Sequence, residues 1–303
     1  MAMSCLSVKA QDIDSLLAKG DDYEFTTSDS LAIFQLFDSL MNLEDLVGSQ
    51  LAFRLSYNSN VLAAGRTLGI EQFGLAPGIS YYHKSGAYAD ISAFWSKDFE
   101  PPFYLTTLSA GYLHIFSRKF SMLANYDHYF YTDVGDDSYT PYTNAATISS
   151  YLDFRHVSFR TDYSYYFGDA RAHRIMPALG LVLRKKNLLG IDRVSFLPTF
   201  YMLMGDVVLN EVEFVDPKTP LERFQNRLKY GTPYSILIKD KRVFGILNYA
   251  ISCPLSLTIK NNWMFNITYT YNIPKAVEDE PLVLGETGYL SASFVYYLDL
   301  RKK

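Results

Sequence analysis

The 303-residue chain lacks the features that mark several common classes of protein. Its only two cysteines, Cys5 and Cys253, form neither a metal-ligand nor a redox spacing. The net charge of -4 gives no basic excess, which argues against nucleic acid as a partner. No run approaches the roughly 18 consecutive apolar residues that a membrane-spanning helix needs. If the chain crosses a membrane, it therefore does so with strands and not with helices.

Aromatic residues are what the sequence has in excess. They make up 16% of the chain, with 25 Tyr and 21 Phe against 2 Trp. A tyrosine ring is apolar in its body and polar at its tip, which suits membrane interfaces and the wet walls of barrels. Charged residues reach only 20%. The composition favours surfaces that meet an apolar and a polar phase together.

The first 47 residues differ in pattern from the rest. We interpret residues 1–10 as the remnant of a truncated export signal, because small residues flank Lys9 before Gln11; an ordinary disordered terminus is the alternative. Residues 11–47 are predicted to form a periplasmic helical segment, with a helix over 29–46 that Ser28 or Asp29 caps. The apolar positions at helical spacing are Ile33, Phe34, Phe37, Leu40 and Met41.

From about residue 48 to residue 303 the hydrophobic period is two. In the segment 263–271, odd positions are aromatic or apolar and even positions are mostly amide or hydroxyl. The fold class predicted is all-β: a transmembrane antiparallel up-and-down β-barrel of about 12 strands, preceded by a short N-terminal helix. The predicted strands lie at 51–58, 73–81, 89–96, 103–116, 120–131, 145–154, 157–167, 174–184, 194–204, 247–258, 263–271 and 290–299.

Short and long connections alternate strictly between these strands. The short ones, at 83–86, 117–120, 155–156, 184–191 and 260–262, are rich in basic residues. The long ones lie at 60–71, 97–103, 132–144, 168–173, 205–241 and 273–287. Outer-membrane barrels have short periplasmic turns and longer outer loops, so this alternation predicts the cell outer membrane with a periplasmic N-terminus.

Three prolines conflict with this pattern. Pro77, Pro177 and Pro198 fall inside predicted strands, each in the apolar register. Proline removes a donor from the ladder and normally belongs at edges or bulges. They therefore indicate either bulges or strands that are shorter than drawn.

In architecture, residues 50–300 resemble the uncharacterised outer-membrane β-barrels of Bacteroidota, a Gram-negative group. The resemblance rests on the Tyr-rich strands and on Ala10-Gln11 after the signal remnant. It contains no diagnostic catalytic motif. It implies a location and a fold but no activity.

The register predicted to face the lumen collects charges of both signs. Opposed Arg and Asp side chains would form a porin-like constriction for small polar solutes, and small inward residues such as Gly78, Gly111 and Gly180 would leave space for it. The alternative is an internal salt-bridge network that closes the barrel and makes it a scaffold or subunit of an envelope complex. The lumen candidates are Arg54, Asp90, Asp127, Arg160, Asp162, Arg174, Arg193, Asn248 and Asn266.

Aromatic residues near the strand ends are predicted to meet the membrane interfaces, where outer-membrane barrels carry aromatic girdles. Outer-membrane lipid is the expected partner of this surface. Trp263 is assigned to the periplasmic interface and Tyr271 to the outer one. The full set of candidates is Tyr57, Trp95, Tyr165, Trp263 and Tyr271.

Two segments could contact an envelope protein partner: 29–46 and 205–241. The second contains a helix-like patch at 221–228, which either folds into the barrel mouth as a lid or caps long strand extensions. The five histidines are scattered along the sequence, so we expect no enzyme. We also expect no cofactor and no metal.

Overall fold

The computed structural model of the protein describes residues 49–59, 74–97, 100–132, 142–230, 233–278, 280 and 285–300. The helix expected over 29–46 lies outside these residues. In the described part, no helix is long and apolar enough to cross a membrane. The elements are β1 (Gln50–Asn58), β2 (Gly74–Tyr82), β3 (Ala87–Trp95), β4 (Phe103–Ile115), β5 (Phe120–Tyr131), β6 (Asn144–Phe154), β7 (Val157–Phe167), β8 (Arg171–Leu181), β9 (Leu183–Leu188), β10 (Ile191–Phe196), β11 (Thr199–Val215), α3 (Pro220–Tyr230), β12 (Ser235–Ile259), β13 (Trp263–Pro274) and β14 (Thr287–Asp299).

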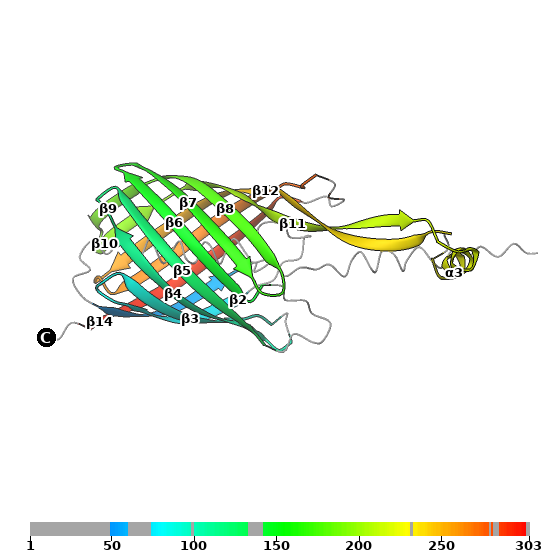
Figure 1. Cartoon of the computed structure of the whole chain (residues 1–303). Coiled ribbons are helices and arrows are strands. Elements are labelled where there is room, and N and C mark those ends of the chain that lie inside the picture. The colour runs from blue at the N-terminus through cyan, green and yellow to red at the C-terminus, as the bar shows by residue number, and fades with distance from the viewer. Residues whose placement is uncertain are drawn as a thin grey trace, which may run out of the picture.

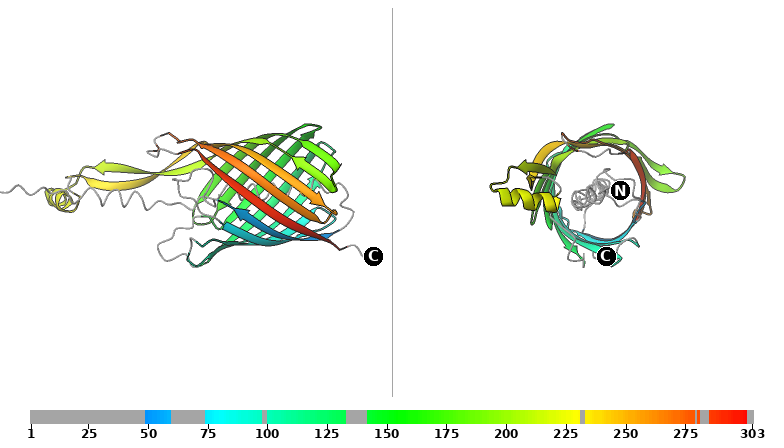
Figure 2. Two further views of the ribbon diagram at one scale, coloured as in Figure 1. Left: turned by 180° about the vertical axis from the view of Figure 1, so that it is seen from behind. Right: turned by 90° about the vertical axis from the view of Figure 1, so that its right-hand side faces the viewer.

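The strands form one closed antiparallel sheet (Figure 1). β1 to β8 follow in sequence order, β8 pairs with β11, β11 with β12, and β14 returns to pair with β1. β9 continues β8 after Val182, and β10 leads into β11 across Leu197 and Pro198. The fourteen labelled strands therefore make twelve barrel strands, which confirms the predicted fold class. The view along the barrel in Figure 2 shows the closed ring.

Alternation along each strand separates an apolar outer face from a mainly polar inner face. In β13, Phe265, Ile267 and Tyr269 are exposed, whereas Asn266 and Thr268 between them are buried. Because side chains of a strand point to opposite sides in turn, a closed barrel sends one set inward and the other outward. The phase predicted from the sequence is confirmed, with the aromatic and aliphatic residues outside.

The prolines are accommodated by gaps in the ladders. The β2–β3 ladder passes from Leu75 to Gly78 without pairing Pro77, and the β8–β11 ladder passes over Pro177 in the same way. Pro198 stands at the break between β10 and β11. The first two lie in continuous strands that show no bulge at the proline, so the expectation of bulges or shorter strands was wrong there. A missing N–H costs little where the neighbouring strand forms no bond.

The segment 205–241 is a strand hairpin and not the loop that was predicted. β11 and β12 stay paired from Gly205↔Gly245 to Val215↔Ser235, and α3 lies at the tip. The last β8 partner of β11 is Gly205, so ten residues continue beyond it, a reach of about 30 Å at the usual rise per residue. Figure 1 shows this hairpin projecting away from the barrel. The helix-like patch is confirmed, and the lid interpretation was wrong.

The connection predicted at 184–191 is also mostly strand. β9 and β10 pair from Leu183↔Phe196 to Leu188↔Ile191, which leaves only Leu189 and Gly190 as the turn. Both turn residues have positive φ, 51° and 81°, as a tight hairpin turn of this kind requires. The β9–β10 hairpin lies at the end of the barrel opposite the long β11–β12 hairpin (Figure 1).

Candidate functional site

The candidate site is the inner face of the barrel, where the structure places all nine lumen candidates. Their strand register is the buried one in each case. Most of them come from different strands, so only the closed sheet brings them together. They fall into three charged groups on β1–β7, the separate Arg174 on β8, a neutral group on β12–β14, and the half-buried Arg193 on β10.

Arg54 and Asp90 form the first charged group. The guanidinium Nη2 of Arg54 donates to both carboxylate oxygens of Asp90 at 3.1 Å and to Ser92 Oγ at 2.6 Å. Ser80 and Ser92 also donate to the Asp90 carboxylate. Asp90 is 8% exposed, and its charge is matched by a cation and two hydroxyls. Such a satisfied network is rigid, because each polar atom has a fixed partner.

Asp127 belongs to a second group that contains no cation. Asn125 Nδ2 donates to Asp127 Oδ2 at 2.7 Å, and Ser109 also bonds to this carboxylate. The hydroxyl of Tyr88 donates to Asn125 Oδ1 at 2.5 Å. The chain Tyr88–Asn125–Asp127 therefore links β3 to β5 across β4. The carboxylate is held by neutral donors.

Arg160 and Asp162 form the third group, two residues apart on the inner face of β7. Arg160 Nε lies 3.4 Å from Asp162 Oδ2. The Arg160 guanidinium also lies over the ring of Tyr151, 4.8 Å from its centroid. A cation over an aromatic face is attracted by the ring quadrupole, which fixes the guanidinium against the wall of the barrel.

The inner face of β12–β14 carries amides and hydroxyls and, over the stretch from Asn248 to Thr258 on β12 and along β13, no charged side chain. Asn248 Nδ2 donates to Asn272 Oδ1 at 2.9 Å, and Asn266 Nδ2 donates to Ser293 Oγ at 3.0 Å. In ring order these three strands lie across from β4–β6. The barrel interior therefore has a charged side and a neutral hydrogen-bonding side.

A collar of buried apolar side chains stands at the short-turn end of the interior. It is one packed cluster that runs from β13 through β14 and β1 to β6, and each member lies near a short connection. The sequence reasoning missed it, because tyrosines were assigned to the interfaces. Strand alternation could have identified these tyrosines as inward-facing, because Tyr82 lies on the same strand face as Ser80, and Tyr88 on the same face as Asp90. The members are Ala52, Tyr82, Tyr88, Leu113, Leu123, Tyr151, Met264, Val295 and Tyr297.

The small inward residues do not leave the space that was expected of them. A Cβ at Gly78 would lie 2.7 Å from Ser92 Oγ and 2.9 Å from Arg54 Nη2. A Cβ at Gly111 would lie 2.4 Å from the Tyr88 ring. Neighbouring side chains fill the space beside these glycines, so the glycines do not widen a passage.

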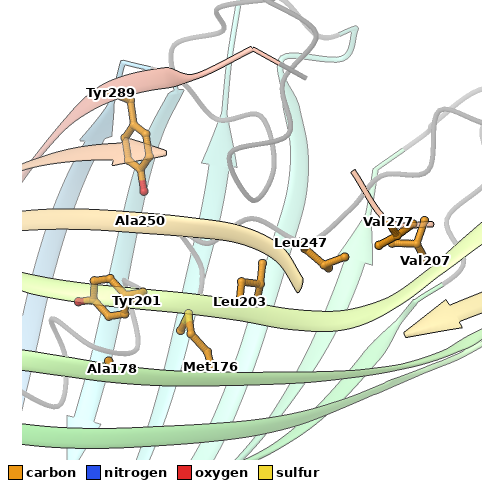
Figure 3. Packing of buried hydrophobic residues seen from close by; sticks show 9 residues of the cluster. All are labelled: Met176, Ala178, Tyr201, Leu203, Val207, Leu247, Ala250, Val277 and Tyr289. Atoms are coloured by element: carbon orange, nitrogen blue, oxygen red, sulfur yellow. The ribbon is translucent and has the colours of Figure 1, made fainter. Parts of the chain in front are cut away.

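Two further clusters line the interior. One, on β4–β8, contains Tyr129, Tyr142 and Tyr166 with Leu105. The other gathers residues from β8, β11, β12 and β14 with Val277 from the segment after β13 (Figure 3). Apolar residues thus stand at both ends of the interior, and on β8 and β11 they also reach the row of Arg160, whose register neighbour is Ala178. Figure 3 labels the second cluster: Met176, Ala178, Tyr201, Leu203, Val207, Leu247, Ala250, Val277 and Tyr289.

The five interface candidates lie in the outward register. Trp263 is at the short-turn end and packs against Tyr296, with ring centroids 4.4 Å apart, and against Phe294 at 5.1 Å. The other four, Tyr57, Trp95, Tyr165 and Tyr271, lie near the long-connection ends of their strands. Aliphatic residues occupy the middle of the outer face, among them Ile91, Ile148 and Ile267.

Within the described ranges, no group of three or more His, Cys, Asp or Glu side chains is placed to hold a metal ion. His83, His114, His128, His156 and His173 are spread over turns and the outward face. His173, for example, bonds through Nδ1 to the hydroxyl of Tyr163 at 2.8 Å. The polar groups that converge are those of the barrel interior.

The chain matches no protein-family model, and no curated protein matches its sequence. Among solved structures, it is similar to the KdgM porin at 9% identity and a TM-score of 0.45, over 82% of this chain and 98% of that one. It is similar to the NanC porin at 9% identity and a TM-score of 0.42, over 81% and 98%. The translocator domain of autotransporter NalP from Neisseria meningitidis follows at 10% identity and 0.36, over 90% and 98%. At these values none of the similarities carries an inference about what this chain does.

Proposed function

We propose that the protein is an outer-membrane β-barrel that lets small polar solutes pass through its interior. One observation carries the proposal: the closed barrel is inverted relative to a soluble protein, with charged groups inside and a continuous apolar belt outside. Exposed apolar residues occur on every barrel strand from β1 to β8 and on β11–β14. A belt of this extent far exceeds the apolar patches of soluble monomers. Lipid is the environment that would cover it.

The orientation follows from the connections. The short basic turns and the collar belong at the periplasmic end, together with Gln50, the first residue of β1, which pairs with Tyr82 there. The β11–β12 hairpin then projects from the outer surface. Outer-membrane barrels place short turns on the periplasmic side, which supports this assignment.

The solutes are small, because side chains occupy much of the interior. Four tyrosines of the collar narrow the periplasmic end, and Arg54–Asp90 and Arg160–Asp162 stand directly beside that layer. Opposed charges of this kind act on a passing solute through their field and select against apolar molecules. The neutral wall of β12–β14 offers hydrogen bonds that replace part of the solute's hydration.

The test is conductance of the purified full chain in a planar bilayer. We expect steady current, with ion selectivity that changes in Arg160→Gln and in Asp162→Asn in opposite directions. Correct folding is checked first by heat-modifiable migration in detergent. Folded protein that stays silent over a wide voltage range would overturn the channel.

A second candidate function, a closed barrel that serves as a scaffold in an envelope complex, is favoured by α3. Its residues Leu221, Phe224 and Leu228 are 60–66% exposed and share one face of the helix at i, i+3 and i+7 spacing. Asn226 on the other side is buried. Helices of this pattern dock into apolar grooves. If the barrel is a scaffold, a crosslinker at the hairpin tip should capture a specific partner in cells. Phe224→Ser should abolish this crosslink without affecting folding, whereas Gln225→Ser should retain it.

A further inference from the structure

We propose that Arg174 forms a binding subsite for a small organic carboxylate near the long-connection end of the barrel interior. The inference deepens the proposed function and rests on it, because it names a class of solute for the same interior. It starts from a buried arginine whose charge no acidic side chain of the described part of the chain compensates.

Arg174 is buried without an acidic partner among the residues that the structure describes. Its side chain is 6% exposed, and its Nε has no hydrogen-bond partner. The two inward ion pairs of the described residues are Arg54–Asp90 and Arg160–Asp162, and Arg174 belongs to neither. A buried guanidinium nitrogen without an acceptor or a counter-charge is unfavourable. A bound anion would remove that penalty.

The guanidinium of Arg174 is oriented by its neighbours. Its Cζ lies 5.6 Å from the centroid of the Tyr166 ring, so the group rests near an aromatic surface on β7. On the other side Gly205 gives the stem room, because a Cβ there would lie 3.1 Å from Arg174 Cγ. A planar guanidinium fixed in this way presents its N–H edge, which matches the two oxygens of a carboxylate.

Neutral hydrogen-bonding groups share the row of Arg174 across the sheet. The register places Asn125 beside Thr147, Thr147 beside Ser164 and Ser164 beside Arg174. The hydroxyls of Thr147 and Ser164 are 2.9 Å apart. None of these groups carries a negative charge, so none competes with an incoming carboxylate for the guanidinium.

The position of Arg174 on its strand gives the direction of approach. It is the fourth residue of β8, which begins at Arg171. The connection from β7, predicted as a long one over 168–173, is a turn of three residues, 168–170, so little of the chain stands between Arg174 and this end of the barrel. Tyr129, Tyr142 and Tyr166 line this end of the interior. Aromatic side chains there suit a carboxylate that carries a ring, with the carboxyl group directed at Arg174.

The direct test is binding of sodium benzoate to the folded full chain in detergent, followed by saturation-transfer NMR. Benzyl alcohol serves as the probe of equal ring size without charge. We expect benzoate to bind and benzyl alcohol to bind far more weakly. Arg174→Gln should lower benzoate affinity at least about tenfold, since hydrogen bonds to charged groups contribute about 1.5–3 kcal/mol.

Arg171→Gln is the matched control, because Arg171 lies on the same strand with its side chain exposed on the outer face. It should leave benzoate binding unchanged. Tyr166→Leu is a second variant that tests the subsite if Arg174→Gln does not fold. It keeps the charge of Arg174 but removes the aromatic surface beside it, and it should weaken benzoate binding. Equal benzoate binding in the wild type and Arg174→Gln, or no binding to the wild type, overturns the subsite.

Conductance separates this inference from the proposed function. Benzoate binding that depends on Arg174, in a barrel that passes no current, supports the subsite and refutes the channel. Current with a reversal potential that is the same in the wild type and Arg174→Gln, together with absent benzoate binding, refutes the subsite and supports the channel. Current whose anion preference falls in Arg174→Gln supports both.

Discussion

The ring of Tyr88 on β3 occupies the space over Gly111 on β4. The two residues are register partners, and a Cβ added to Gly111 would lie 2.4 Å from the ring and 2.7 Å from the backbone oxygen of Ala124. The neighbouring backbone cannot yield as a flexible side chain would. Gly111 therefore fixes the position of a collar tyrosine, and with it the Tyr88–Asn125 hydrogen bond.

The first prediction is that Gly111→Ala destabilises the barrel by about 1–3 kcal/mol, the usual range for overpacking a filled interior. Urea unfolding from lipid vesicles measures the change. Gly285→Ala is the control, because nothing lies within 4 Å of a Cβ at that position. Equal stability of the two variants would show that the Tyr88 ring moves freely.

The second prediction concerns the collar as the narrow part of the passage. Tyr82→Ala should raise single-channel conductance, because it removes a ring that is 4% exposed at the short-turn end of the interior. The adjacent Tyr81→Ala removes a ring from the outer face and should leave conductance unchanged. An equal effect of the two substitutions would contradict the assigned faces.

The third prediction tests the Arg54–Asp90 pair. Arg54→Leu should destabilise the barrel by about 3 kcal/mol, since it leaves a buried carboxylate without its cation. The double variant Arg54→Leu/Asp90→Leu should recover most of that loss. The double-mutant cycle in urea unfolding measures the coupling. Additive losses would mean that Ser80 and Ser92 alone suffice for the Asp90 carboxylate.

The fourth prediction tests the lipid-facing belt by depth. Ile267→Arg in the middle of β13 should cost about 2–4 kcal/mol in lipid vesicles, whereas Ile115→Arg at the end of β4 should cost about 0–1 kcal/mol. Both side chains are exposed, 49% and 58%, so the contrast lies in position alone. If both substitutions were neutral, water and not lipid would cover this surface.

Much of the barrel could be predicted locally. The strand period is two, and one phase is apolar, so Phe265 and Ile267 are assigned outward and Asn266 inward from the sequence alone. The number of strands follows in the same way. Interior prolines were misjudged, because whether a missing donor matters depends on the neighbouring strand, which no local pattern names.

The twelve strands, their alternating faces and the placement of Arg and Asp on one face can be predicted from local sequence, because these features depend on residues two positions apart. The tertiary structure decided which charges meet. Arg54 forms an ion pair with Asp90, 36 residues away, and Arg160 forms one with Asp162 on the same strand. Arg174 lies beside the ring of Tyr166. It also decided that 205–241 leaves the barrel as a hairpin, because continued pairing of β11 with β12 requires the register of both strands. Those outcomes depend on strand neighbours and side-chain reach, which are set only when the sheet closes.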